Sequence, residues 1–187
     1  FVRGGSENTD NKSRSRYNVE ELIATSVMLT DIINNTESPS NVTVAAIFPY
    51  AAQIERFTKK YKDLINKAKK VFSSFDIDTV DAFQGKESDI VLVNTVITDL
   101  SRRNFLSDFR RINVSMSRAK DKLIIFGNKI VLERLDMNVY DGSKRKYFKE
   151  IIANISKQGQ MIEYSSEGGM KIETPSETKT KIRKIKK

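Results

Sequence analysis

Two segments of the chain carry residue types that could bind an anionic ligand. The first is the tetrad Gln84-Gly85-Lys86-Glu87, which comes just before the apolar run 89–96. A glycine lets the backbone approach a ligand closely, and the polar groups around it could contact phosphate or ribose. An ordinary solvated turn before a buried strand explains the same residues. Taken alone, the tetrad leaves both interpretations open.

The second segment is 107–120, whose apolar spacing predicts a helix with Ser107 as its N-cap. Arg111 and Arg118 are seven residues apart in it. That spacing is two helical turns, so it predicts both guanidinium groups on one face, beside the apolar stripe. Arginine suits phosphate because its planar fork binds bidentately and keeps its charge. Surface ion pairs, with Asp81 or Asp108 for Arg111, are the alternative.

Composition excludes several kinds of chemistry. The chain has 187 residues, no Cys and no His. Thiol nucleophiles, histidine acid-base catalysis and nearly all zinc, haem or iron-sulfur sites are therefore excluded. No apolar run is long enough for a membrane span and no signal peptide opens the chain, so we expect a cytoplasmic protein without a membrane partner. The start at Phe1 suggests a piece of a longer polypeptide.

The positive charge is unevenly distributed. The net charge is +9, but residues 171–187 hold seven cations and two carboxylates, which leaves only +4 for the rest. A basic charge favours a polyanionic partner. The end of the chain is either a disordered, solvated tail or an arm that binds nucleic acid.

The periodicity of apolar residues predicts alternating helices and strands around one core. The first helix begins with Asn18 as its cap and has Glu20 and Glu21 in its first turn. The predicted helices are 18–33, about 50–70, 107–120 and about 144–157, and the predicted strands are 42–48, 76–80, 89–96, 122–126 and 161–164. We expect a flexible N-terminal segment over 1–17 with no element in 1–16, one domain over 18–167, and a basic, disordered tail over 168–187.

Strands that alternate with helices on short connections predict an α/β fold, a parallel sheet with helices on both faces. Ligands bind such sheets at the carboxyl ends of the strands. The segments that follow Phe48 and Val80 are both predicted to lie there.

The order and spacing of these segments occur in one family. The chain resembles the second RecA-like domain of a superfamily 1 helicase, of the group that includes the nonsense-mediated-decay and Sen-type helicases. VDAFQGKESDIVLV (80–93) resembles motif V, and FRRINVSMSRAKDKLIIFGN (109–128) resembles motif VI. VAAIFPYAAQ (44–53) resembles motif IV, and YNVEE (17–21) the Asn-x-x-Glu element before it. The resemblance covers roughly residues 18–128.

The resemblance implies a nucleotide site made of five residues. Arg118 matches the arginine finger that reaches the γ-phosphate across the cleft between two lobes, and Arg111 assists it or pairs with a carboxylate. Gly85 would offer its backbone N–H to the γ-phosphate and Glu87 would accept from the ribose hydroxyls. Gln84 would couple this site to the nucleic-acid surface. Lys86 stands where relatives often have Arg or Ser, so we expect only an accessory role for it.

The resemblance also implies a nucleic-acid surface. Thr79 matches the hydroxyl that binds a phosphate of the strand, and Pro49, Tyr50 and Gln53 lie where motif IV borders the nucleic-acid track. Tyr50 is a candidate for base stacking, and a half-buried Tyr that caps a strand is its alternative.

Half of the family's ATPase site is missing from this sequence. It contains no G-x-x-x-x-G-K-[ST] loop, and neither the magnesium-binding carboxylates nor the Gln-Tyr-Arg element of the family is present. The resemblance therefore predicts a RecA-like P-loop NTPase fold that lacks its P-loop. ATP and Mg²⁺ would be the cofactors, with the metal ligands on the first RecA-like lobe of the same polypeptide. The isolated chain is predicted to be inactive.

We therefore expect the second motor lobe of an ATP-dependent helicase that acts on single-stranded DNA or RNA. A catalytically silent nucleic-acid-binding module, in which the basic tail binds, is the alternative. A dinucleotide-dependent oxidoreductase is disfavoured because no G-x-G-x-x-G follows any predicted strand.

Overall fold

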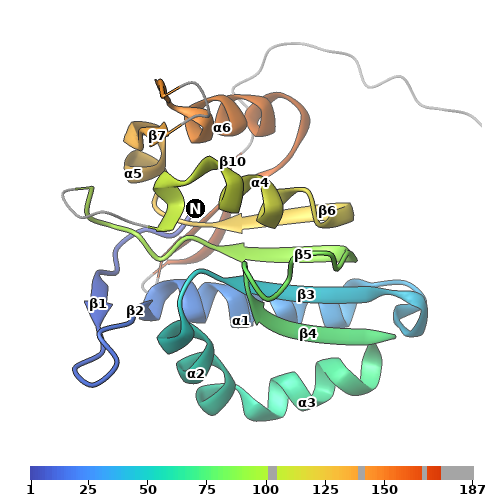
Figure 1. Ribbon diagram of the computed structural model, residues 1–187. Helices are drawn as coiled ribbons and strands as arrows, with labels where there is room; N and C mark the ends of the chain where they lie inside the picture. Colours follow the sequence, from blue (N-terminus) through green and yellow to red (C-terminus); the bar gives the residue numbers. More distant parts are fainter. Residues whose placement is uncertain (101–104, 139–141, 166–167, 174–187) are drawn as a thin grey trace, which may run out of the picture.

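The computed structural model describes residues 1–100, 105–138, 142–165 and 168–173. Its centre is a four-stranded parallel sheet in the order β4-β3-β5-β6 (Figure 1). These strands are β3 (Thr43–Phe48), β4 (Ser74–Thr79), β5 (Ser88–Asn94) and β6 (Ala119–Phe126). The predicted parallel α/β architecture is confirmed. Because the strands are parallel, all their amino ends lie at one edge of the sheet and all their carboxyl ends at the opposite edge.

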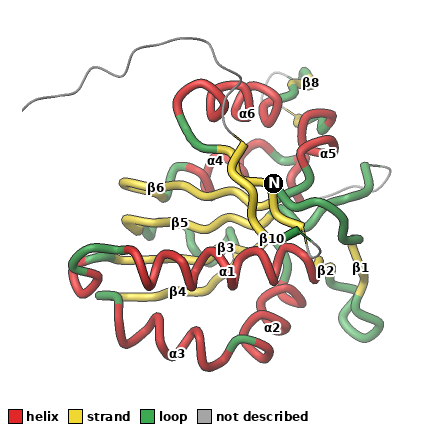
Figure 2. The backbone as a smooth tube through the Cα atoms, turned by 180° about the vertical axis from the view of Figure 1, so that it is seen from behind, coloured by secondary structure: helices red, strands yellow, loops and turns green. Residues whose placement is uncertain are grey.

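Three helices cover one face of the sheet: α1 (Val19–Asn35), α2 (Ala51–Lys60) and α3 (Lys62–Val71). Figure 2 shows α1 running along this face. Side chains alternate along a strand, so Val44, Ala46 and Phe48 of β3 all point into this core. Each is buried, as a strand covered on both faces requires.

The opposite face is covered by α4 (Phe109–Met116) and by the connection between β4 and β5. Ala45 and Ile47 point to this side, where they pack in one cluster with Val80 and Phe83 of that connection. The connection therefore lies on the sheet as part of the core.

Helix α1 begins as the sequence predicts. Asn18 has extended backbone angles, and its side-chain oxygen accepts hydrogen bonds from the amides of Glu20 and Glu21 at 3.0 and 3.2 Å. These bonds satisfy two of the amides that a helix start leaves without partners.

The single helix predicted over about 50–70 is wrong, because α2 and α3 are separated at Tyr61 (φ −114°, ψ 32°). The ring of Tyr61 packs at 5.3 Å from that of Phe57, and Ile65 is buried on the other side of the break. The bend lets both helices bring their apolar side chains to the same core. Periodicity did not show it, because the apolar spacing continues across Tyr61.

Helix α4 is shorter than predicted. It ends at Met116, and its N-cap is Asp108, which accepts from the Arg110 amide at 2.9 Å. Strand β6 starts at Ala119 because it already pairs there with Ser88 of β5. Arg118 therefore lies in the turn between α4 and β6, and the prediction that it shares a helix face with Arg111 is wrong.

The N-terminal segment contains regular structure where the sequence predicted none. Strand β1 (Glu7–Thr9) pairs with β2 (Arg16–Asn18) as an antiparallel hairpin. Val2 forms a bridge with Tyr164 of β9 (Met161–Ser165), the strand predicted over 161–164.

The chain after β6 forms short elements above the sheet. Helix α6 (Tyr147–Gln158) starts later than predicted, because β8 (Lys144–Arg145) pairs with β7 (Met137–Asn138) just before it. Helix α5 (Lys129–Arg134) and the 3₁₀ turns η1 (Pro39–Asn41) and η2 (Phe105–Ser107) complete the list of helical elements in the described ranges.

Strand β10 (Gly169–Glu173) pairs with β9, so this hairpin continues past the domain boundary predicted at 167. The rest of the predicted tail, 174–187, lies outside the described residues. Within the described residues, no helix is long and apolar enough to cross a bilayer.

The buried sheet predicts a clear contrast between two isoleucines. Ile47 in the centre of β3 is 0% exposed, whereas Ile130 on α5 is 61% exposed. Ile47→Ala should lower the free energy of unfolding by about 2–5 kcal/mol and Ile130→Ala by less than about 0.5 kcal/mol. Urea denaturation followed by circular dichroism measures both values. Equal losses would contradict the assigned core.

Candidate functional site

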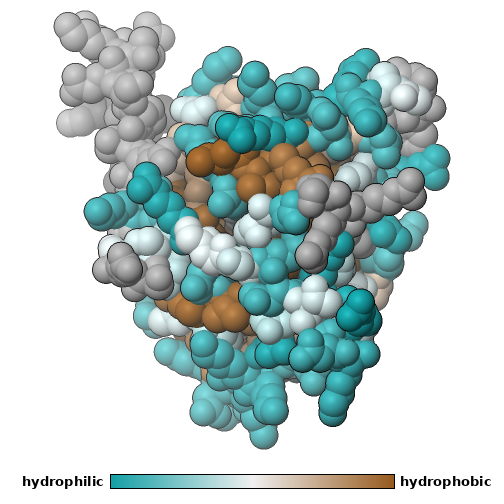
Figure 3. All heavy atoms as spheres, turned by 90° about the vertical axis from the view of Figure 1, so that its left-hand side faces the viewer, coloured by the Kyte–Doolittle hydropathy of each residue, from teal (hydrophilic) through white to brown (hydrophobic). Residues whose placement is uncertain are grey.

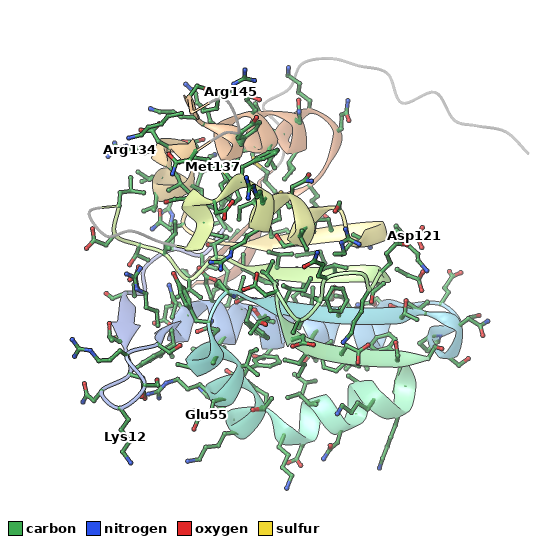
Figure 4. The ribbon with its side chains drawn as sticks, viewed as in Figure 1. Lys12, Glu55, Asp121, Arg134, Met137 and Arg145 are labelled. Atoms are coloured by element: carbon green, nitrogen blue, oxygen red, sulfur yellow. The ribbon has the colours of Figure 1, made fainter. Side chains whose placement is uncertain are left out.

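Two of the five candidate nucleotide residues, Glu87 and Arg118, adjoin at the amino edge of the sheet, where β5 and β6 begin. Ser88 pairs with Ala119, and the Ser88 N–H donates to the carbonyl oxygen of Arg118 at 3.0 Å. Glu87 and Arg118 immediately precede the paired residues. The structure thus brings together two residues that are 31 positions apart in the sequence. Asp121, labelled in Figure 4, marks this edge.

The tetrad reaches this edge by crossing the sheet. Strand β4 ends at Thr79, which is level with Phe48 at the carboxyl edge, and β5 starts with Ser88 at the opposite edge. Residues 80–87 connect the two ends, and Phe83 anchors the crossing at 1% exposure. The prediction that the tetrad lies with the carboxyl ends of the strands is therefore wrong for 85–87.

Gly85 leaves the backbone open at the candidate site. Its φ is +84°, a region that suits glycine, and no atom lies within 4 Å of where a Cβ would stand. Gln84 and Glu87 are exposed beside it. Lys86 turns back to Asp78, with Nζ and Oδ2 3.3 Å apart, which fits an accessory role.

Arg118 is half-buried, and its Nε donates to the Val114 carbonyl oxygen at 3.1 Å. Val114 packs in the cluster that contains Phe83, so the arginine and the crossing segment lie on the same face of the sheet. Within the described residues, the Arg118 guanidinium makes no ion pair. It therefore carries a charge that a ligand could use.

Arg111 pairs with a carboxylate, as the alternative for it predicted. Its Nη2 lies 3.5 Å from Oδ2 of Asp81. Both side chains are well exposed, so the pair adds little to stability. It does join α4 to the crossing segment, a contact between the two regions that resemble motifs V and VI.

The candidate strand-binding residues lie at the opposite, carboxyl edge. Phe48 pairs with Thr79, so Pro49 and Tyr50 stand next to the end of β4. Tyr50 is half-buried at the start of α2, and the Arg16 guanidinium lies 5.8 Å from its ring centroid. Figure 3 looks onto this edge and shows apolar areas framed by hydrophilic side chains.

Two of these residues are already engaged within the fold. The Thr79 hydroxyl accepts from the Ala82 amide at 3.3 Å, which closes the turn after β4. Pro49 is buried. Thr79 is half-exposed at the end of β4.

Gln53 does not face the surface. It is 0% exposed, and its amide bonds both ways with the backbone of Asn18: Asn18 N–H donates to Oε1 at 2.8 Å and Nε2 donates to the Asn18 carbonyl at 3.2 Å. The predicted direct contact of Gln53 with nucleic acid is therefore wrong for this structure. The residue fastens α2 to the start of α1.

Sequence reasoning missed the role of Glu21. Its place in the first turn suggested an interaction with the helix dipole, but the side chain is 0% exposed. Its carboxylate accepts from the amides of Thr95 at 3.0 Å and Val96 at 2.9 Å. Burial raises the pKa of the Glu21 carboxyl from its usual 4.5 to about 7, and the bonds from Val96 and Thr95 oppose that rise. The Asn-x-x-Glu spacing was the signal in the sequence.

Among the described residues, no group of three or more acidic side chains could hold a metal ion. The groups at the amino edge are instead two kinds of hydrogen-bond donor, a backbone amide and a guanidinium, and single carboxylates, which accept hydrogen bonds.

Comparison with known proteins decides the family. A family model described as an AAA domain matches residues 2–130. The chain belongs to this family. It is 35% identical over 185 residues to helicase sen1 of Schizosaccharomyces pombe, and the match covers 92% of this chain and 11% of that protein.

Two further relatives agree with this assignment. An ATP-dependent helicase of Methanocaldococcus jannaschii is 34% identical over 130 residues, which are 70% of this chain and 18% of the relative. Regulator of nonsense transcripts 1 of Caenorhabditis elegans is 45% identical over 69 residues, which are 36% of this chain and 6% of the relative. This AAA domain thus spans less than a fifth of each relative's length. The predicted resemblance to the Sen-type and nonsense-decay helicases, and with it the RecA-like fold, is confirmed.

The raised pKa of Glu21 predicts how the stability of this AAA domain depends on pH. The folded-state pKa of about 7 lies above the usual 4.5, so folding favours the protonated carboxyl. The associated stability is fully present below the lower value and is lost as pH rises through the higher one. The free energy of unfolding should fall by roughly 2–3 kcal/mol between about pH 5 and about pH 8.5.

Glu21→Gln should remove that slope, because an amide does not titrate. Urea denaturation across the pH range measures it. Glu55→Gln is the matched control, since Glu55 is exposed on α2 (Figure 4), and it should keep the wild-type slope. An unchanged slope in Glu21→Gln would exclude Glu21 as its source.

Proposed function

We propose that this domain is the second motor lobe of an ATP-dependent helicase that acts on single-stranded DNA or RNA. One observation carries the proposal: Glu87 and Arg118 adjoin at the amino edge, while Tyr50 and Thr79 adjoin at the carboxyl edge. The same short sheet would connect a nucleotide bound at one edge to a nucleic-acid strand bound at the other. A motor needs such a connection if the phosphates of the nucleotide are to change the affinity for the nucleic acid.

The amino edge suits a triphosphate. The backbone at Gly85 is open to a close approach, so its N–H can reach a phosphate oxygen without a side chain in the way. The Arg118 guanidinium supplies a permanent positive charge where charge develops during phosphoryl transfer. Glu87 is exposed and can accept hydrogen bonds from ribose hydroxyls. Gln84 lies on the segment that runs between the two edges, and we propose that it couples the nucleotide site to the nucleic-acid surface.

The carboxyl edge suits a single strand. The half-buried ring of Tyr50 can stack on a base, and its neighbour Arg16 adds a cation near the same ring. Thr79 offers a hydroxyl for a phosphate oxygen.

The residues of this chain account for half of an ATPase site. ATP supplies the transferable phosphoryl group, and the Mg²⁺ that neutralises it would be held by a first lobe that carries the P-loop and acidic residues. Since this domain lacks those groups, we propose that it is inactive alone and that the first lobe of the same polypeptide is its partner.

The alternative, a silent binding module with a basic tail, is supported by the charge of +5 on residues 171–187. In that alternative, replacing Arg118 changes nothing, whereas the motor lobe needs Arg118 for ATP turnover.

The proposed finger predicts a large loss of turnover. In a polypeptide that joins this domain to its P-loop lobe, Arg118→Ala should lower strand-stimulated ATP turnover about a thousandfold, because the charge on the transferred phosphate loses its partner. Arg118→Lys should recover only part of the rate, since an ammonium lacks the planar fork. Phosphate release measures the rate. Arg110→Ala, an exposed neighbour on α4, is the control. Wild-type turnover in Arg118→Ala would exclude the finger.

The proposed strand site predicts a second effect, which separates it from the tail. Tyr50→Ala should weaken binding of a labelled single-stranded oligonucleotide by about tenfold through loss of stacking. Fluorescence anisotropy measures the affinity of the 187-residue chain, and Tyr61→Ala, between α2 and α3, is the aromatic control. Abolished binding on removal of 171–187, with Tyr50→Ala unchanged, would favour the basic-tail module.

A further inference from the structure

A strained turn follows β5 at the carboxyl edge. Val96 has a φ of +69° and is 0% exposed. For a β-branched residue this left-handed conformation is a genuine outlier that costs on the order of 1–3 kcal/mol. Such strain persists only where the surroundings hold it in place.

The start of α1 holds this turn through hydrogen bonds on both sides of Val96. The Val96 N–H lies 2.9 Å from each carboxylate oxygen of Glu21, and the Thr95 N–H donates to Oε2 at 3.0 Å. Asn18 Nδ2 donates to the Val96 carbonyl oxygen at 3.4 Å. Because Glu21 and Asn18 are 0% and 2% exposed, water does not compete for these bonds.

Asn18 is also bonded to the helix that carries the candidate strand-binding residue Tyr50. Gln53, which bonds twice to the backbone of Asn18, lies in the first turn of α2, three positions after Tyr50. A displacement of Tyr50 by a bound strand would therefore move a helix turn that is bonded directly to the residue holding Val96.

The residue after Val96 connects the turn to α4 by packing. Ile97 is 0% exposed and packs in one cluster with Leu106 and Ile112. Ile112 lies on α4, the helix that precedes Arg118. Close-packed clusters transmit a displacement because they contain no space to absorb it. An unbroken series of buried contacts thus runs from Gln53 through Asn18, Val96 and Ile97 to α4.

We propose that Glu21 is a positioning residue that holds the strained Val96 turn. Through this turn, binding of a nucleic-acid strand at the carboxyl edge changes the local stability of α4, the helix that directly precedes Arg118. The inference rests on the proposed function and adds to it the residue through which the two edges communicate. Glu21 touches neither ligand. It acts through Val96 and Ile97.

Hydrogen exchange in the 187-residue chain tests the proposal. Exchange of the backbone amides of α4 is measured by NMR with and without a single-stranded oligonucleotide, and affinity is measured in parallel by anisotropy. In the wild type, strand binding should change the exchange rates of α4 amides by about tenfold. In Glu21→Gln, the affinity should stay within about threefold of the wild type while the α4 response is lost.

Two controls separate positioning from general destabilisation. Glu20→Gln changes the neighbouring acidic residue, which has no bond to Val96, and should keep the response. Ile65→Val removes a methyl group from α3 and should lower stability by about 1 kcal/mol and also keep the response. Loss of the response in Ile65→Val would show that any destabilisation suffices and would overturn the proposal.

Val96→Gly supplies a second variant, which keeps the test decisive if Glu21→Gln fails to fold. Glycine adopts a φ of +69° without strain, so the turn no longer needs to be held, and the α4 response should fall while the strand still binds. A full response in both variants overturns the proposal. Strand binding without any α4 response in the wild type overturns the coupling but leaves the proposed function intact. No strand binding by the wild type overturns both.

Discussion

The parallel pairing of β5 with β6 is the constraint on which the candidate nucleotide site depends. The Ser88 N–H and the Arg118 carbonyl oxygen form the first bond of that ladder. A shift of the register by one residue would send Leu123 and Ile124 to the cores on the opposite faces of the sheet, so side-chain packing specifies the pairing. Glu87 and Arg118 are neighbours because the residues after them are hydrogen-bonded partners in a buried sheet.

Parallel strands also separate the two candidate sites. A crossover connection must return from the carboxyl edge to the amino edge, and here residues 80–87 do so on the face shared with α4. Phe83 and Val80 hold this connection to the sheet, while Arg111 and Asp81 join it to α4. A segment that begins beside Thr79 therefore ends beside Arg118. The proposed motor function uses this geometry, since one short segment touches both edges.

Local chemistry made much of the fold predictable. Asn18 is a good cap wherever it precedes an amphipathic run, and the apolar strands have no other stable place than inside a sheet. The resemblance to helicase motifs V and VI also predicts that Gly85 and Arg118 contact one ligand, and this stays a prediction. The break at Tyr61 was not predictable, because the bend depends on where the core lies and the apolar spacing continues through it. Gln53 and Glu21 were misjudged for a similar reason, since their buried partners are distant in sequence.

The sequence by itself determined where the strands of the central sheet and the first helix lie, and that the chain contains no G-x-x-x-x-G-K-[ST] loop. These follow from composition, periodicity and spacing, which are local properties of the chain. The resemblance to a helicase family added which side chains could meet a nucleotide. Only the tertiary structure decided which edge of the sheet each group occupies, that Gln53 faces inward, and that Glu21 holds a strained Val96. Those outcomes depend on strand direction and on contacts between residues far apart in sequence. Interactions between residues that are close in the sequence do not specify these contacts.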